Sequence, residues 1–302
     1  MRLTHVVLPS EHGFRMESVL RGSMLISANQ LRKAKKTGLP ILLDGQPSFT
    51  NQRVHTGQRV EIELPDFSGR ITVPPSERIP PVPLRILYED ECLVIVWKCA
   101  FLETHASPSH PRGSDTLEER VSAALGLSLH PVHRLDAETS GPVVFAKNPH
   151  VQHRLQRAMA AGLWKKEYRA AVFHVPDPAE GMIRKPIRRE TPDSFTRVAA
   201  EDGKEAFTWY ETLIRKEAYG EAVSLLSISP LTGRTHQIRV HLAHIGCPIL
   251  GDKRYATPES KALSGRLGLS RQQLCSIAVS FPHPISKERV SIRQESDLNV
   301  PF

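Results

Sequence analysis

The sequence lacks the features that mark several large classes of protein. No stretch approaches the ~20 consecutive apolar residues that a membrane-spanning helix needs. The opening residues, MRLTHVVLPSEHGFRMES, contain no continuous apolar segment of the kind found in secretory signals. Cysteine is scarce, with 4 residues and no CxxC pair, so neither a zinc ribbon nor a disulfide framework is indicated. We therefore expect a cytoplasmic protein with reduced thiols and no membrane partner.

Sequence motifs for several common chemistries are also missing. There is no GxGxxG after a strand, no GxxxxGKS/T and no HExxH, which argues against dinucleotide, phosphate-loop and zincin chemistry. The hydrolase pattern GxSxG is absent as well. Two HxxH pairs, at residues 150–153 and 241–244, have no evident third ligand, so we expect these histidines at the surface or at helix ends. Neither a cofactor nor a metal is predicted.

Positive charge is what the chain has in surplus. Its 40 Lys and Arg against 32 Asp and Glu give a formal net charge of +8, with 14 His in addition. This balance favours a polyanionic partner, although charge that only serves solubility is the alternative reading. Hydrophobic residues make up 40% of the 302 residues, which suffices for real cores and suggests roughly two domains.

Proline divides the chain into two modules. Residues 69–83 read GRITVPPSERIPPVP, and five prolines cannot lie in a helix interior or a central strand. We predict an extended linker here, with a small module at residues 1–68 and a larger one at residues 84–302.

The small module is predicted to carry a basic helix beside a small sheet. Ser27 is a suitable N-cap for ANQLRKAKKTG, and Gly38 is a suitable stop. Two strands follow, PILLDG with a turn at Asp44-Gly45, and QRVEIELP with alternating apolar residues. The basic residues of the helix are Arg32, Lys33, Lys35 and Lys36. They make a plausible phosphate-contacting surface, while an ordinary solvated helix face is the alternative.

Strand-like segments dominate the large module. KKEYRAAVFHV, EAFTWYETLI and EAVSLLSISPL are rich in β-branched and aromatic residues, and QQLCSIAVSFPHP supplies a last strand. Helices are predicted after Asp115, which stands three residues before Glu118 as in a capping box, and after Asn148. A third helix, TGRTHQIRVHLAHIG, has Thr235 as its expected cap and Gly246 as its end. The irregular order of elements predicts an α+β fold with a mostly antiparallel, mixed sheet.

One loop, HRLDAETSG at residues 133–141, holds an acidic side chain next to an arginine. Asp136 precedes the apolar run PVVFA, so it needs a cationic partner near the core, and Arg234 or Arg239 could supply it. His236 and Arg239 are three apart and are expected on one helix face. A carboxylate held by arginine stays ionised and can act as a nucleophile or a base. The alternative is a buried Asp–Arg pair that only fixes the loop.

This loop resembles the catalytic loop of the RluA-type pseudouridine synthases, whose pattern is HRLDxxTSG. KEYRAAV at residues 166–172 resembles the family's second motif, and TGRTHQIRVHLAHIGCPILGDKRY at residues 232–255 resembles its third. The likeness covers most of residues 84–285, and three motifs in the same order are more specific than any one. More loosely, the small module resembles the S-four RNA-binding domain that often precedes this catalytic domain.

The resemblance implies an RNA pseudouridine synthase whose catalytic domain has a central cleft and which acts on ribosomal RNA or tRNA without cofactor or metal. Asp136 would be the essential aspartate, which either attacks the anomeric carbon or removes a ribose proton. Tyr168 would stack on uracil and assist the loss of the base proton, and Arg239 would pair with Asp136. Arg134 would enter the RNA helix in place of the flipped uridine. The other RNA-binding residues expected are Arg32, Lys33, Lys35, Lys36, Arg234 and His236.

Two stretches depart from the family pattern. Where the family has Asn-Lys-Pro and then glycine, this chain has Trp97-Lys98-Cys99-Ala100-Phe101, and the family's Leu-His-Ala is Leu274-Cys275-Ser276. We expect both stretches to shape the edge of the cleft and to affect substrate choice. Two rival functions remain open at this point, a non-catalytic RNA-binding or assembly factor and a metal-dependent hydrolase. We expect a monomer.

Overall fold

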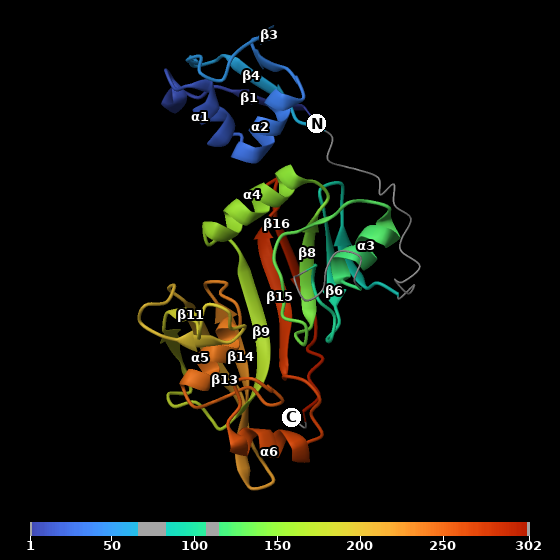
Figure 1. Ribbon diagram of the computed structural model, residues 1–302, viewed down its shortest axis with the longest axis vertical. Coiled ribbons are helices and arrows are strands. Elements are labelled where there is room, and N and C mark those ends of the chain that lie inside the picture. The colour runs from blue at the N-terminus through green and yellow to red at the C-terminus, as the bar shows by residue number, and fades with distance from the viewer. Residues whose placement is uncertain (1, 66–82, 107–114, 301–302) are drawn as a thin grey trace.

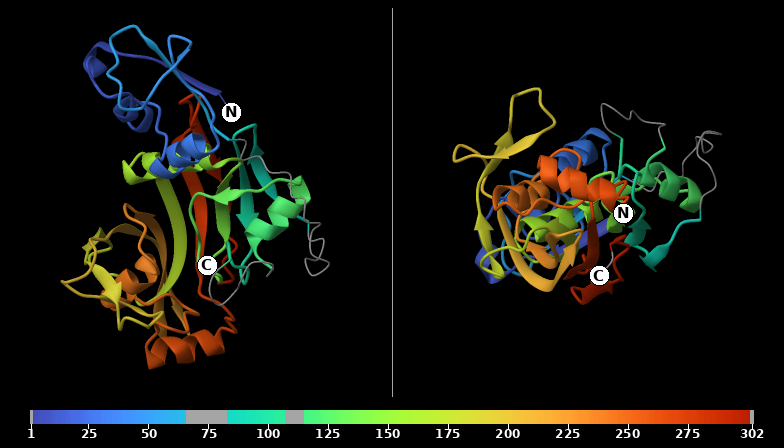
Figure 2. Two further views of the ribbon diagram at one scale, coloured as in Figure 1. Left: turned by 45° about the horizontal axis from the view of Figure 1, so that its top comes forward. Right: turned by 90° about the horizontal axis from the view of Figure 1, so that it is seen from below.

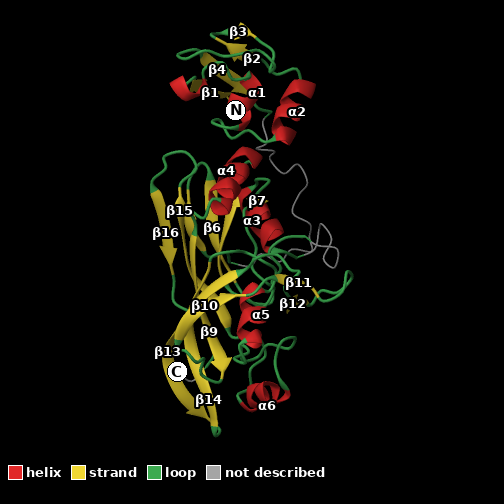
Figure 3. Ribbon diagram, turned by 90° about the vertical axis from the view of Figure 1, so that its left-hand side faces the viewer, coloured by secondary structure: helices red, strands yellow, loops and turns green. Residues whose placement is uncertain are grey.

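The computed structural model describes residues 2–65, 83–106 and 115–300 (Figure 1). All but the last residue of the linker expected at residues 69–83 lies outside the described residues. Figures 1 and 3 both show the small module at one end of the molecule, beyond helix α4. Within the described parts of the chain, no helix has the length and apolar character needed to cross a membrane.

The small module is a four-stranded antiparallel sheet with helices on it, and it has a core of its own. The strand order is β1-β4-β2-β3. Its elements are β1 (Arg2–Val6), the 3-10 helix η1 (Pro9–Glu11), α1 (Met16–Arg21), α2 (Ala28–Lys36), β2 (Ile41–Leu43), β3 (Gln46–Pro47) and β4 (Arg59–Glu63). One cluster of buried apolar side chains, all between residues 7 and 64, fills the space between sheet and helices. The module therefore has the packing of an independent folding unit.

Local signals in the small module act as predicted. Ser27 caps α2, because its hydroxyl accepts the Gln30 N–H at 3.2 Å and the Gln30 side chain accepts the Ser27 N–H at 2.9 Å. The chain leaves the helix at Gly38, whose φ is +68°. Asp44 and Gly45 both have positive φ and form the predicted turn between β2 and β3.

The large module contains two main antiparallel sheets and a hairpin. The six-stranded sheet has the order β10-β13-β14-β9-β15-β16, the four-stranded sheet the order β5-β6-β8-β7, and β11 pairs with β12. The strands are β5 (Ile86–Glu89), β6 (Leu93–Lys98), β7 (His130–Pro131), β8 (Gly141–Ala146), β9 (Lys165–Phe173), β10 (Glu180–Arg184), β11 (Ile187–Arg189), β12 (Arg197–Ala199), β13 (Phe207–Ala218), β14 (Glu221–Pro230), β15 (Leu274–Pro282) and β16 (Arg289–Arg293).

Every ladder between these strands is antiparallel, and parallel pairing occurs among the described residues only as isolated bridges. The expected α+β class is confirmed. One prediction was incomplete, because β15 is not the last strand. β16 follows it as an edge strand whose short alternating pattern, RVSIR, leaves three of its five side chains exposed. The right-hand view of Figure 2 shows the hairpin region, in yellow, standing away from the rest of the chain.

Four helices complete the large module. They are α3 (Leu117–Leu125), α4 (Pro149–Ala160), α5 (Gln237–His244) and α6 (Pro258–Arg266). In Figure 3, the strands β9, β13 and β14 make up one side of this part of the molecule and α5 and α6 lie on the other. Strands β6 and β8 are buried at every residue, because alternate side chains enter two different apolar clusters on the two faces of their sheet.

Two predicted helix caps were wrong. Thr116, not Asp115, caps α3, since the Thr116 hydroxyl accepts the Glu119 N–H at 3.3 Å while Asp115 forms an ion pair with Arg120. Thr235 does not cap α5, because the residue before the first turn is His236, in the left-handed region at φ +56°. The predicted cap of α4 at Asn148 and the end of α5 at Gly246, whose φ is +75°, are confirmed.

Candidate active site

The loop at residues 133–141 joins β7 to β8 and is fixed by hydrogen bonds to its backbone. The Thr104 hydroxyl donates to the Leu135 carbonyl at 3.0 Å and accepts the Leu135 N–H at 3.2 Å. The Thr139 N–H donates to the Asp136 carbonyl at 3.0 Å, which closes a turn around Asp136. The acidic side chain is therefore presented from a backbone that has little freedom.

A buried lysine ties this loop to the end of β6. The Lys98 side chain is completely enclosed, and its ammonium donates to the carbonyls of Cys99, Leu102 and Ala137 at 3.0, 2.7 and 2.8 Å. These three acceptors use all three protons of the ammonium group. Burial lowers the pKa of Lys98 to about 8. Lys98 matches the lysine of the family pattern Asn-Lys-Pro, but its role in holding the loop could not be predicted from the sequence.

The glycine that ends the loop is required by its surroundings. Gly141 has a φ of +137°, and a Cβ atom there would lie 2.4 Å from the Ser276 carbonyl oxygen. The close approach lets the Ser276 N–H donate to the Ser140 carbonyl at 2.9 Å. The loop is thereby docked on β15, so the end of the HRLDAETSG motif serves the packing of two sheets.

Helix α5 brings an arginine to the acidic side chain across 103 residues of sequence. Arg239 Nη1 donates to Asp136 Oδ2 at 3.1 Å. Arg234, the other candidate partner, instead directs its Nε to the Glu205 carbonyl at 2.9 Å. Of the two arginines considered from the sequence, the structure brings Arg239 to Asp136, and Figure 1 shows its helix beside β13.

A second carboxylate holds the same arginine. Arg239 donates from Nε and Nη2 to the two oxygens of Asp252, at 2.7 and 3.0 Å. Burial alone would raise the pKa of Asp252, but the hydrogen bonds and charge of Arg239 keep that pKa below its usual value. Sequence reasoning missed Asp252, although a lone acidic residue in the basic stretch GDKRY was a usable signal.

His236, the residue before the first turn of α5, lies close to Asp136. Its Nε2 is 3.9 Å from Asp136 Oδ2, and its Nδ1 is 2.8 Å from the Tyr255 hydroxyl. Burial and neighbouring arginines lower the pKa of His236 to about 4, so the ring is neutral near pH 7. The Tyr255 hydroxyl oxygen also accepts the Arg197 N–H at 3.0 Å, which links the His236 ring to β12.

Tyr168 stands on β9, the strand between β14 and β15, opposite Ile228 on one side and Ser276 on the other. Its side chain is buried, and burial raises its pKa well above the usual range of a phenol. Tyr168 is therefore a neutral phenol near pH 7.

These side chains line one cavity of about 280 Å³. It lies where the loop at residues 133–139, the start of α5 and the strands β9, β14 and β15 meet. The predicted site residues in its wall are Arg134, Asp136, Tyr168, Arg234, His236 and Arg239. Its volume is close to the ~300 Å³ at which small-molecule sites begin. Lys166 also lines it and was missed, and burial lowers the pKa of this lysine to about 8.

The other predicted RNA-binding residues lie elsewhere. The side chains of Arg32, Lys33, Lys35 and Lys36 are on the exposed face of α2 in the small module. A separate groove runs between this module and α4, and it is lined among others by Arg15, Arg21, His153 and Arg157. Cationic side chains thus follow the molecule from α2 toward α4.

Of the two stretches that depart from the family pattern, residues 274–276 reach the wall of the cavity through Leu274, whereas no residue of 97–101 lines it. Cys275 is completely buried in a small core with Trp97 and Ile277. Cys99 and Phe101 follow β6 with exposed side chains. They lie at the end of β6 that Lys98 ties to the loop, so their influence on the cavity is through the backbone.

The histidines of the two HxxH pairs do not behave as a metal site. His241 is buried between the Thr208 hydroxyl and the Lys185 carbonyl, each 2.9 Å from a ring nitrogen. His150 is buried too, so the expectation of surface or capping positions was wrong for these two residues. It holds for His244, which is exposed.

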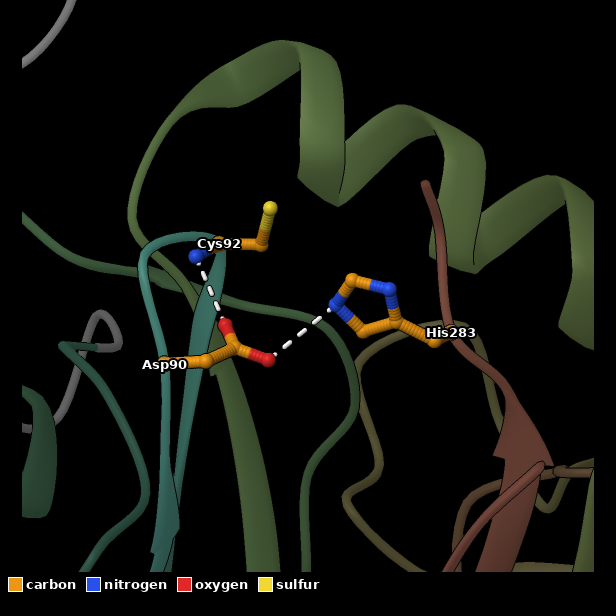
Figure 4. Close-up of side chains that lie close together, drawn as sticks. All are labelled: Asp90, Cys92 and His283. Carbon is orange, nitrogen blue, oxygen red and sulfur yellow. Dashed lines mark hydrogen bonds and ion pairs between the residues drawn. The ribbon is translucent and has the colours of Figure 1, made fainter. Parts of the chain in front are cut away.

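Asp90, Cys92 and His283 are the described residues whose metal-ligating atoms lie together, within 4.8 Å of one another (Figure 4). The Asp90 oxygens are occupied: Oδ1 accepts the N–H of Cys92 and of Leu93, and Oδ2 accepts the Tyr88 hydroxyl and lies 3.1 Å from His283 Nε2.

The tautomer of His283 also disfavours a metal. His283 Nδ1 accepts the Ser286 N–H at 3.1 Å, so the proton of the neutral ring is on Nε2, which lies 3.1 Å from Asp90 Oδ2. A histidine ligand has the opposite arrangement, with a free lone pair toward the metal and the other nitrogen donating. The group is best described as an Asp–His pair that joins the β5–β6 and β15–β16 turns.

Comparison with known proteins gives a consistent result. The family model described as RNA pseudouridylate synthase matches residues 93–244. An uncharacterized RNA pseudouridine synthase of Chloroflexus aurantiacus is 34% identical over 296 residues, which cover 93% of this chain and 86% of that protein. The dual-specificity RNA pseudouridine synthase RluA of Pasteurella multocida is 35% identical over 209 residues, covering 69% of this chain and 91% of that one.

Solved structures show the same fold. Human RNA pseudouridylate synthase domain containing 4 is similar with a TM-score of 0.56 and 26% identity, over 70% of this chain and 88% of that one. Human RNA pseudouridylate synthase domain containing 1 is similar with a TM-score of 0.60 and 23% identity, over 72% and 85% of the two chains.

Proposed function

The chain belongs to the RNA pseudouridine synthases, a family of isomerases that act on RNA, and from this premise we propose that it converts specific uridines of ribosomal RNA or tRNA to pseudouridine with Asp136 as the essential residue. The observation that carries the proposal is the placement of Asp136, in a cavity wall beside Tyr168 and hydrogen-bonded to Arg239. The site combines a held carboxylate with a neutral aromatic ring, which suits a reaction without redox change.

The reaction exchanges one glycosidic bond for another. The bond from C1′ to N1 of uracil breaks, the base turns, and a bond from C1′ to C5 forms while C5 loses its proton and N1 gains one. Asp136 either attacks C1′ to form a covalent intermediate or removes a ribose proton to give a glycal-like intermediate. Both roles need an ionised carboxylate at the ribose, and Asp136 would be placed for either role by a fixed loop and by its hydrogen bond from Arg239.

Tyr168 is proposed to stack on the uracil and to assist the loss of the C5 proton. A buried neutral phenol on a central strand offers a rigid apolar face for a base. Since burial raises the pKa of Tyr168, it cannot take the proton as a phenolate until RNA binding changes its surroundings. Stacking is therefore the part of its role that the free protein already supports.

Arg134 is proposed to take the place of the flipped uridine in the RNA. Its side chain is exposed at the cavity next to Asp136, where it can reach a base stack while the uridine enters. Flipping costs a few kcal/mol and favours uridines in loops or loosely paired regions. Arg234 and His236, in the same wall, complete the proposed contacts at the cavity.

Recognition beyond the cavity is proposed to rest on phosphate contacts. We assign them to the exposed cations of α2 and to the groove between α1 and α4. The proposal includes the division into residues 1–68 as an S-four-like RNA-binding module, residues 69–83 as a linker and residues 84–302 as the catalytic domain. It also includes a monomeric, cytoplasmic enzyme whose RNA affinity falls steeply with salt.

The test is to map pseudouridines in total cellular RNA from three strains: the parent, a deletion of this gene, and the deletion carrying Asp136→Asn. One uridine that loses its mark in both mutants identifies substrate, reaction and essential residue together. If no site changes, purified protein is incubated with pooled transcripts labelled with tritium at uracil C5. Failure to release tritium there would count against the enzymatic assignment of this chain.

A further inference from the structure

Arg239 is shared by two carboxylates that differ in their surroundings. Asp252 receives two hydrogen bonds, from Nε and Nη2, while Asp136 receives one, from Nη1, at 3.1 Å. The Asp252 side chain is 0% exposed, against 21% for Asp136. Asp252 therefore has no access to a substrate, and Asp136 does.

The charge balance of these three groups is what makes the arrangement informative. Two carboxylates and one guanidinium sum to a charge of −1. The two oxygens of Asp252 largely neutralise the guanidinium of Arg239 that they bind. Arg239 can therefore hold Asp136 in place without strongly lowering the reactivity of its carboxylate. In a lone Asp136–Arg239 pair, Asp136 would instead face the full positive charge of the guanidinium. That charge would stabilise the carboxylate and make it a weaker nucleophile or base.

We propose that Asp252 is a positioning residue for the isomerisation, which turns Arg239 so that Nη1 meets Asp136 and takes up enough of its charge to leave Asp136 reactive. This inference rests on the proposed function, because it assumes that Asp136 reacts with the uridine. Asp252 acts through Arg239 and touches no reacting atom.

The backbone around Asp252 is built for this task. Gly251 has a φ of +75°, and a Cβ there would lie 2.0 Å from the Arg271 carbonyl oxygen, so the turn packs directly on the neighbouring chain segment. The Asp252 carboxylate also accepts the N–H of Tyr255 at 3.1 Å. The guanidinium of Arg239 lies over the Tyr255 ring at 4.9 Å. Both ends of the Asp252–Arg239 pair are thereby fixed by the same turn.

The other titratable groups around Asp136 do not duplicate this effect. Lys98, behind the loop, adds positive charge, and His236 on the other side is neutral near pH 7. Tyr168 is a neutral phenol. Glu103 and Glu138 also line the pocket beside Asp136, where they face the cations Arg134, Lys253 and Arg254. Asp252 differs from them because it is the carboxylate that shares the guanidinium of Arg239 with Asp136 through hydrogen bonds.

The first experiment compares wild type and Asp252→Asn, as full-length proteins, on an RNA that the wild type modifies. We expect kcat to fall on the order of 100-fold, as for a misplaced reacting group, with an unchanged KM for RNA. The acid limb of the pH–rate profile should move to lower pH, since Asp136 then faces the cations alone. Asp115→Asn is the matched control, because Asp115 binds Arg120 with two hydrogen bonds at 2.5 and 2.6 Å away from the cavity.

Two further variants separate positioning from folding. Asp252→Glu keeps the charge and moves the carboxylate, so kcat should fall while the acid limb stays where it is in the wild type. In a double-mutant cycle with Arg239→Lys, the losses should be strongly non-additive, because Asp252 acts only through Arg239.

Additive losses, or an unchanged kcat in folded Asp252→Asn, overturn the inference. If Asp252→Asn does not fold, a shifted acid limb in Asp252→Glu overturns the charge-sharing part in its place. A wild type that makes no pseudouridine in any RNA instead defeats the proposed function. An active wild type and an inactive Asp136→Asn, together with a fully active Asp252→Asn, would defeat this inference alone.

Discussion

In the small module the cations of α2 stand on an exposed face, whereas in the large module Lys98, Arg239 and Asp252 are enclosed by protein. The two arrangements have different energetics. Exposed cations keep their hydration, and in the proposed function each would contribute to RNA binding almost independently, with its own salt dependence. Enclosed ions must satisfy one another, so the removal of one leaves a partner unpaired and the losses are not additive.

Under the proposed function, the comparison shows how one chain could bind a long polyanion and still hold a single reactive carboxylate. Binding would then be distributed over many exposed side chains, and the reaction would depend on a few enclosed groups with fixed partners. Variants in the large module should therefore change kcat or stability, and variants on α2 should change affinity. The following predictions test that division.

Asp136→Asn should have the largest effect. Because it removes the reacting carboxylate but no part of the α2 surface, kcat should fall by at least ~10⁴-fold. The dissociation constant for RNA, measured by filter binding at fixed salt, should stay close to that of the wild type. Loss of RNA binding or of the folded state in this variant would contradict both the assignment and the division between the modules.

Gly141→Ala should destabilise the large module by about 3 kcal/mol, because a Cβ in the left-handed region would meet the Ser276 carbonyl. Thermal unfolding followed by circular dichroism measures it. Gly265→Ala is the matched control, since Gly265 lies in α6 with nothing within 4 Å of a new Cβ. The control should raise stability by about 0.5–1 kcal/mol. Equal effects of the two changes would mean that the loop is not held as tightly as its contacts indicate.

Much of this could be predicted from the sequence because the signals are local. Ser27 and Asn148 each cap the helix that follows, and strands in the six-stranded sheet follow β-branched runs. Local signals failed where side chains had a choice of partners. Asp115 was expected as a cap but forms an ion pair with Arg120. Thr235 was expected to cap α5, but the N-cap position is taken by His236, whose backbone is in the left-handed region.

Asp252 and Tyr255 show the limit for the site itself. Their part depends on where the turn at residues 251–255 packs, and this is decided by the distant Arg271 carbonyl. The spacing of residues along the sequence cannot predict such a contact. The same holds for Lys98, whose three carbonyl partners come from two separate segments.

His150→Met tests how an enclosed polar side chain of the large module affects the free energy of unfolding. Both ring nitrogens of His150 are buried without a hydrogen-bond partner among the described residues, and burial, with Arg154, lowers its pKa to about 4. An unfolded histidine takes up a proton as the pH falls below ~6.5, but the folded one does not until about pH 4. The stability that depends on neutral His150 is thus full above pH ~6.5 and is lost as the pH falls toward 4.

Relative to wild type, His150→Met should therefore be neutral or slightly stabilising at pH 7.5 and gain about 2 kcal/mol more at pH 5. Urea unfolding at the two pH values measures this difference. An equal effect at both would show that His150 takes up its proton in the folded protein as easily as in the unfolded chain, which would break the contrast between enclosed and exposed groups.

Neutralising two α2 cations, in the double variant Arg32→Gln with Lys36→Gln, should have the smallest effect. In contrast to Asp136→Asn, it should lower the affinity for RNA and leave kcat unchanged. Both side chains are exposed, so the fold has little reason to change. Removing one cation that neutralises a phosphate should reduce the slope of log affinity against log salt by about 0.7–0.9, and removing both should reduce it by about 1.4–1.8 if each binds RNA. At saturating RNA the kcat should equal that of the wild type, because Asp136, Arg239 and Asp252 are untouched. A fall in kcat with unchanged affinity would mean that the small module takes part in the reaction step, and the division of tasks between the modules would then be wrong.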